Sequence, residues 1–367
     1  MCVASIPTGH RRTGLCPTFA RPSRQRDGLL LRVPLVGGAL PHEHIDVLAA
    51  VSGAFGTGVV ELTNRGNLQL RGFGDAHIQD VLARCRAVGL GEVGASLVTV
   101  SPFAGTAEHR LRGRLVEVLE TIDGLSEKFV VHVDDAEGST AGRLADATLT
   151  LEAQDRCALA VRGWGSARLS VSRAVDIVGE VAAACVASGP FTRANELEAL
   201  SSIKWRPTPV QPERPLSLGV ADRVDGVLAV AGARLGRLAV PQLATLGDIQ
   251  RRFELPPARV TPWRSVAFVC TDASQGAAVL EHAAQAGLLT DPADPMASVI
   301  TCIGRQGCWQ TQLDTFAQVE QLLAAWPSDL QLGDLVHVSG CDKSCATRAP
   351  VARTLMGRSD SSGFDLR

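Results

Sequence analysis

Residues 27–40 read DGLLLRVPLVGGAL, and residues 225–238 read DGVLAVAGARLGRL. With a constant offset of 198, several residues of the first copy recur in the second, among them Asp27, Gly28, Leu30, Gly38, Leu40, Leu48 and Thr63. Both copies predict the same order of strand, glycine turn, helix and strand ending in threonine. Two unrelated α/β units could share such residues by chance. A repeat of this length nevertheless favours duplicated domains, because solenoid proteins repeat every ~20–50 residues.

The length of the chain predicts several domains, since 367 residues are too many for one ordinary core. The segments after the two copies have different helix and strand patterns and predict a larger α+β unit after each copy. The expected order is a flexible lead-in at 1–26, a small α/β unit at 27–90, a larger unit at 91–204, a Pro- and Arg-rich linker at 205–219, a second small unit at 220–272 and a second larger unit at 273–367.

Composition and charge exclude several classes of protein. The formal net charge is −2, so no overall basic field marks a nucleic-acid-binding protein. The chain lacks the run of about 18 apolar residues of a membrane span, and its N-terminus lacks the apolar segment of a secretory signal. We therefore expect a cytoplasmic protein with ten reduced cysteines, where clustered cysteines favour metal ligands or catalytic groups.

Four of the cysteines form two pairs in glycine-containing loops. TCIGRQGC (301–308) holds Cys302 and Cys308, and GCDKSC (340–345) holds Cys341 and Cys345. Each pair follows a predicted strand, and four thiolates on two loops suit an iron–sulfur cubane. Structural zinc favours more closely spaced pairs, and four unliganded buried thiols are the other alternative. The remaining six cysteines are isolated and are interpreted as structural.

A second group of polar residues lies in ELTNRGNLQLRG (61–72). Alternation along a strand places its polar side chains on one face and Leu68 and Leu70 on the other. A face with two guanidinium groups suits a ligand with several carboxylates, although a solvated sheet face is the simpler alternative. The candidate binding residues are Thr63, Asn64, Arg65, Asn67, Gln69 and Arg71.

Together these motifs resemble the sirohaem-type nitrite/sulfite reductase superfamily. The resemblance covers the chain from about residue 27, through the Cys-x5-Cys and Cys-x3-Cys pairs and the strand LTNRGNLQLRG. It implies an α+β fold with pseudo-twofold duplication, in which each ferredoxin-like half-domain is followed by a larger α+β domain. It also implies a 4Fe-4S cluster on the four paired cysteines. In the reductases the cysteine that corresponds to Cys345 bridges the cluster and the sirohaem iron.

Within the superfamily, VHVSGCDKSCA (336–346) and VTPWRS (260–265) resemble the branch that acts in aerobic cobalamin synthesis. This resemblance implies an O2-dependent monooxygenase that hydroxylates precorrin-3A and forms a lactone. A second iron centre, mononuclear non-haem iron or sirohaem, would be needed, because a cubane with four thiolates has no open position. Without a GxGxxG motif after a strand, the electrons are expected from a ferredoxin or an NAD(P)H-dependent reductase.

A comparison of four cationic positions separates this branch from the reductases. The reductases hold their small anion with two arginines and two lysines, and here Arg65 and Lys128 match one of each. The other two positions fall on Ser96 and Val130, which carry no charge. Each charge-assisted contact is worth about 1.5–3 kcal/mol, so a small dianion should bind poorly. Arg65 and Lys128 remain the candidate catalytic and tetrapyrrole-binding residues.

Two alternative functions stay open on these residues. The first is a short sirohaem-dependent sulfite or nitrite reductase, and the second is a non-enzymatic carrier of a tetrapyrrole or a cluster. The sequence shows no convincing site of two histidines and one carboxylate for a mononuclear iron. His132 and His337 lie in predicted strands and are interpreted as core residues.

Overall fold

The structure is a computed structural model that describes residues 17–91, 97–140, 145–189, 191–207, 216–223, 226–331, 333–347 and 351–366. These residues form two compact units. The first unit comprises the described residues within 17–91 and 216–366, and the second comprises those within 97–207. Within the described residues, no helix is both long and apolar enough to cross a membrane.

Two five-stranded antiparallel sheets form the centre of the first unit. The first sheet has the order β1 (Ser23–Gln25), β2 (Gly28–Val33), β5 (Leu68–Phe73), β4 (Val59–Leu62) and β13 (Arg237–Ala239). The second has the order β11 (Gly219–Arg223), β12 (Gly226–Gly232), β15 (Ser265–Cys270), β14 (Ala258–Val260) and β3 (Ala39–Leu40). Each half-domain therefore gives one edge strand to the sheet of the other half.

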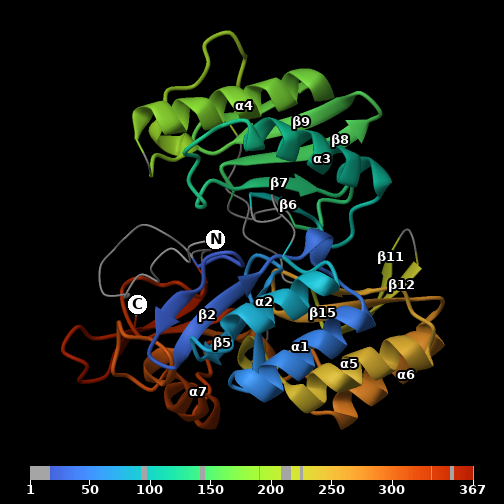
Figure 1. Cartoon of the computed structure of the whole chain (residues 1–367), viewed down its shortest axis with the longest axis vertical. Coiled ribbons are helices and arrows are strands. Elements are labelled where there is room, and N and C mark those ends of the chain that lie inside the picture. The colour runs from blue at the N-terminus through green and yellow to red at the C-terminus, as the bar shows by residue number, and fades with distance from the viewer. Residues whose placement is uncertain are drawn as a thin grey trace. The chain divides into compact units, whose positions relative to one another are not determined.

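The helices of the two half-domains follow the same repeat. They are α1 (His42–Phe55) and α2 (Ile78–Ala87) in the first half, and α5 (Val240–Arg252) and α6 (Ala273–Gln285) in the second. α1 and α5 begin 198 residues apart and pack side by side (Figure 1). Their apolar faces join the strands in one core that is shared by both halves. The predicted duplication is confirmed.

Three of the expected domain boundaries differ from the structure. β1 already belongs to the first sheet, so the half-domain begins before residue 27. α6 packs on β11, β12 and β15, so the second half-domain extends beyond residue 272. In the expected linker, Trp205 packs against the core of the second unit and Arg206 pairs with Ser166.

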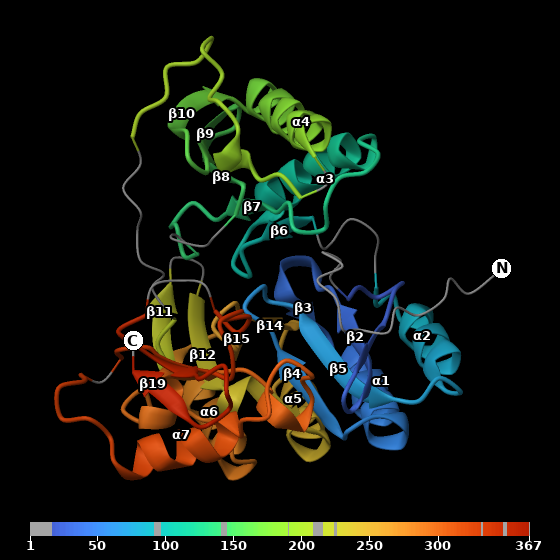
Figure 2. The same ribbon diagram turned by 90° about the vertical axis from the view of Figure 1, so that its left-hand side faces the viewer.

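The second unit is a five-stranded sheet with helices on one face (Figure 2). Its order is β10 (Gly165–Ser170), β9 (Arg156–Val161), β8 (Ala147–Ala153), β7 (Val131–Asp134) and β6 (Val98–Val100), and its helices are α3 (Thr106–Glu120) and α4 (Val171–Ser188). β6, β7 and β8 run parallel, whereas β9 is antiparallel to β8. Val98, Leu115 and Val178 lie in its separate core.

The end of the chain repeats part of this layout within the first unit. A four-stranded sheet has the order β16 (Val299–Thr301), β17 (Val336–Ser339), β18 (Arg353–Gly357) and β19 (Phe364–Leu366), with α7 (Thr315–Ala324) packed on β16 and β17. Its first three strands are parallel and the last is antiparallel, as in β6 to β9. Both larger domains are therefore built on one pattern, which agrees with the predicted α+β duplication.

Candidate functional site

Both cysteine pairs follow neighbouring parallel strands, and this places their loops at the same edge of the last sheet. Cys302 comes directly after β16, and Cys341 lies two residues after β17. Thr301 and Val338 are partners across the two strands. Because parallel strands end at a common edge, the two loops meet there. The two loops thereby bring the four thiols close enough to interact electrostatically.

Backbone N–H groups point at three of the four sulfur atoms. Gly340 donates its backbone N–H to Sγ of Cys302 at 3.4 Å, and Gln310 donates to Sγ of Cys308 at 3.3 Å. The backbone N–H of Lys343 bonds to the Cys341 thiol and stabilises its ionised form. Hydrogen bonds of this kind favour thiolates and influence the properties of a metal bound to them.

The four cysteines also interact electrostatically. Burial, and then the charges of Cys302, Cys308 and Cys341, raise the pKa of the Cys345 thiol to about 11. Burial likewise raises the pKa of Cys341, with further contributions from Cys308 and Cys302. Four thiolates so close together repel one another unless positive charge lies between them. Iron ions would supply that charge, so the arrangement fits a metal-bound state.

Four cysteines supply the number of thiolates that an iron–sulfur cluster requires. Within the described ranges, no three His, Cys, Asp or Glu side chains are arranged to hold one metal ion. In a cubane each iron takes one thiolate, so the four sulfurs surround a body of iron and sulfide rather than one atom. The number of cysteines therefore agrees with the one thiolate per iron of a 4Fe-4S cluster.

Several residues of the polar strand stabilise the fold. The Oγ1 atom of Thr63 accepts hydrogen bonds from the backbone N–H groups of Arg65 and Asn67. The buried side chain of Asn67 accepts from the backbone N–H of Leu35 at 3.0 Å, and Gln69 donates to Glu61 at 2.6 Å. Thr63, Asn67 and Gln69 thus have local roles in the turn and the sheet.

Arg71 is buried, so it does not lie on the solvated sheet face that was the alternative to the predicted binding face. Its side chain is 4% exposed and donates to both carboxylate oxygens of Asp27 at 2.7 and 3.0 Å. A further Arg71 hydrogen bond, of 2.8 Å, reaches the carbonyl oxygen of Gly307, next to Cys308. The guanidinium group is therefore directed at the cysteine loop.

The remaining candidate binding residues are divided between the two units. Asn64 is exposed and Arg65 is half-buried in the turn between β4 and β5 of the first unit. Lys128 lies in the second unit, with its Nζ 5.0 Å from the centre of the Phe191 ring. Val130 is buried, and Ser96 lies outside the described residues.

The two histidines occupy equivalent positions in β7 and β17 but differ in their partners. His132 is buried and bonds to Thr99 through Nδ1 and to Thr140 through Nε2, as expected for a core histidine. Nε2 of His337 is also buried but has no hydrogen-bond partner among the described residues. Burial and the nearby Arg264 lower the pKa of His337 to about 4, so its ring is neutral at pH 7.

Arg264 was not identified from the sequence. It occupies the position of Gly66 in the second copy and has a positive φ of 59°, close to the 66° of Gly66. Its Nη2 donates to the carbonyl oxygen of Ala346 at 2.7 Å, next to Cys345. The offset of 198 could have found it, because an arginine at a position that favours glycine is unusual.

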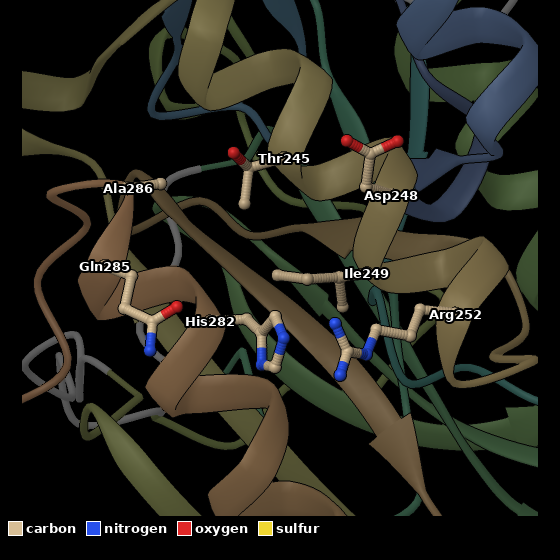
Figure 3. A pocket seen from close by; sticks show the side chains of 7 residues that line it. All are labelled: Thr245, Asp248, Ile249, Arg252, His282, Gln285 and Ala286. Carbon is tan, nitrogen blue, oxygen red and sulfur yellow. The ribbon is translucent and has the colours of Figure 1, made fainter.

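A groove of about 360 Å³ lies between α5 and α6, away from the residues considered above (Figure 3). Asp248 binds Arg251 on the same helix at 2.8 Å, and Nδ1 of His282 donates to the carbonyl oxygen of Ala278 at 3.0 Å. Several of its polar groups are thus engaged within their own helices. The groove contains none of the predicted site residues.

Known proteins resemble this chain at three levels. Residues 21–88 match the family described as the nitrite/sulfite reductase ferredoxin-like half domain. A precorrin-3B synthase from Sinorhizobium sp is 28% identical over an alignment of 396 positions, which covers 97% of this chain and 82% of that protein. The structure of the NirA protein of Mycobacterium tuberculosis has a TM-score of 0.70 at 17% sequence identity, covering 92% of this chain and 73% of the other. The NirA similarity is one of fold.

Proposed function

Because the chain belongs to the nitrite/sulfite reductase superfamily, we propose that it is a precorrin-3B synthase. In this proposal it is an O2-dependent monooxygenase that hydroxylates precorrin-3A at a ring-junction meso carbon and forms a lactone from an acetate side chain. The reaction would precede ring contraction in aerobic cobalamin biosynthesis. The similarity to the Sinorhizobium precorrin-3B synthase over 97% of this chain carries the proposal.

The cysteine loops give the proposal a redox centre. Cys302, Cys308, Cys341 and Cys345 would hold a 4Fe-4S cluster, and the N–H groups directed at three of these sulfurs support that assignment. When bound there, such a cluster would supply single-electron chemistry, with a ferredoxin or an NAD(P)H-dependent reductase as the proposed electron donor. Oxygen activation requires an iron with an open position, so we include a second centre, sirohaem or mononuclear iron, in the proposal.

The substrate would be bound through its carboxylates. Arg65 is the proposed contact in the first unit, together with the polar groups of Thr63 and Asn64, and Lys128 is the candidate contact in the second unit. Guanidinium and ammonium groups bind carboxylates by charge-assisted hydrogen bonds. Three other candidates form hydrogen bonds within the protein, namely Asn67, Gln69 and Arg71. We therefore propose fewer substrate contacts for these three side chains than the strand pattern suggested.

The proposal is tested by spectroscopy followed by turnover. Protein purified without oxygen is expected to contain iron and acid-labile sulfide and to show the absorption and EPR spectra of a cluster. Addition of precorrin-3A, O2 and an electron donor should give a product that carries one oxygen atom from labelled O2. A strong sirohaem spectrum with turnover of sulfite or nitrite would establish the reductase instead. No turnover with any of these substrates would favour a carrier protein.

A Gly340→Ala substitution is expected to lower the cluster content of the protein. A Cβ atom at this position would lie 2.6 Å from Cγ2 of Thr311, so the loop that donates to Cys302 would have to move. Overpacking of this kind costs roughly 1–3 kcal/mol. Iron per chain is the measurement, and Gly74→Ala is the matched control, because the nearest neighbour of its Cβ is 3.9 Å away. Equal iron contents would show that the close packing of Gly340 is not required.

A further inference from the structure

Two arginines, one from each half-domain, bind the two cysteine loops. Arg71 on β5 donates to the carbonyl oxygen of Gly307, and Arg264 after β14 donates to that of Ala346. Gly307 directly precedes Cys308, and Ala346 directly follows Cys345. The duplicated halves thus place equivalent chemical groups beside the last cysteine of each pair. Arg71 also donates two hydrogen bonds to the carboxylate of Asp27.

Arg71 and the loop of Cys308 are packed without free space. A Cβ atom on Gly307 would lie 2.5 Å from Nη2 of Arg71 and 2.8 Å from Oδ2 of Asp27. The carbonyl oxygen of Gly307 also accepts the backbone N–H of Arg26 at 3.3 Å. The side chain of Arg71 is 4% exposed and that of Asp27 is 15% exposed, so water screens their charges weakly.

The charge of Arg71 interacts with the Cys308 thiolate. Burial lowers the pKa of Arg71, but the hydrogen bond to Asp27 and the charges of Glu61, Asp27 and Cys308 raise it, and the pKa is raised on balance. One-electron reduction of a cluster adds one negative charge without making or breaking a bond to the protein. A nearby positive charge stabilises the reduced form, whereas a nearby negative charge destabilises it.

We propose that Arg71 and Asp27 are positioning residues that fix the loop of Cys308 and set the reduction potential of the cluster by their opposed charges. This inference rests on the proposed cluster, and it assigns to Arg71 a role different from substrate binding. Asp27 fixes the orientation of the guanidinium group through two hydrogen bonds, and Arg71 then binds the loop at Gly307.

The test is a reductive titration of the complete protein with dithionite, followed by EPR, together with iron and sulfide analysis. Arg71→Gln is expected to lower the midpoint potential, because Asp27 then remains without its cation. Asp27→Asn is expected to raise it, and the double variant should lie near the wild type. Arg251→Gln, which removes a half-exposed arginine paired with Asp46 on α1, is the control and should not change the potential.

If the two residues had only a structural role, Arg71→Gln and Asp27→Asn would shift the midpoint potential in the same direction or leave it unchanged. Either result would overturn the proposal. If Arg71→Gln cannot hold the cluster, Arg71→Lys decides, because it keeps the charge but not the bonds of the planar group. We expect it to have a lower cluster content with a midpoint close to that of the wild type. A midpoint that differs from the wild type by as much as the midpoint of Asp27→Asn does would contradict the proposal. Wild-type protein without any cluster would refute the proposed function instead.

Discussion

A Cys341→Ser variant is expected to be purified without the cluster. Serine is a poor replacement, because its hydroxyl group stays protonated at neutral pH and binds iron weakly. The substitution also leaves the N–H of Lys343 without its thiolate acceptor. With three thiolates in place of four, one iron of the cubane would lack its protein ligand. The measurement is iron and acid-labile sulfide per chain in protein prepared without oxygen.

The control for this prediction is Cys185→Ala. Cys185 is 3% exposed in α4 of the second unit, and burial raises the pKa of its thiol to about 11. It is a structural cysteine, so the variant should keep the iron content of the wild type. A normal cluster in Cys341→Ser would remove Cys341 from the ligand set. Loss of iron in both variants would indicate that the change in stability, rather than ligation, releases the metal.

The repeat explains why much of the fold could be predicted from the sequence. The offset of 198 relates the first residue of α1 to that of α5, and it also relates the turn closed by Thr63 to the turn closed by Thr261. The exchange of β3 and β13 between the sheets could not be predicted. These strands have two and three residues, too few for a periodic pattern, and their partners lie about 200 positions away.

Only those features of the site that depend on residues close together in the sequence could be predicted. The cysteine pairs are local features, and the parallel order of β16 and β17 brings them together. Arg71 was assigned to a binding face because alternation in a strand shows which side chains share a face and not what covers it. Its partners are Asp27 and Gly307, which are 44 and 236 positions away in the sequence.

Replacing Arg65 by Ala is expected to weaken binding of the tetrapyrrole substrate and to leave the cluster intact. Charge-assisted hydrogen bonds are worth about 1.5–3 kcal/mol, so the dissociation constant should rise roughly tenfold to a hundredfold. The turn itself should persist, because Thr63 closes it through backbone N–H groups and Gly66 provides its positive φ of 66°. Titration of the reduced protein with precorrin-3A without oxygen measures the change.

Two further variants separate charge from structure in this prediction. Arg65→Lys keeps the positive charge and should recover part of the affinity, although its ammonium group lacks the planar geometry of the guanidinium. Arg24→Ala removes a half-exposed arginine that pairs with Asp75 in the same half-domain, and it should bind the substrate as the wild type does. Equal affinity of Arg65→Ala and the wild type would place the binding face elsewhere. A lower iron content in Arg65→Ala would instead show that the turn supports the cluster, since the substrate contact alone does not predict that loss.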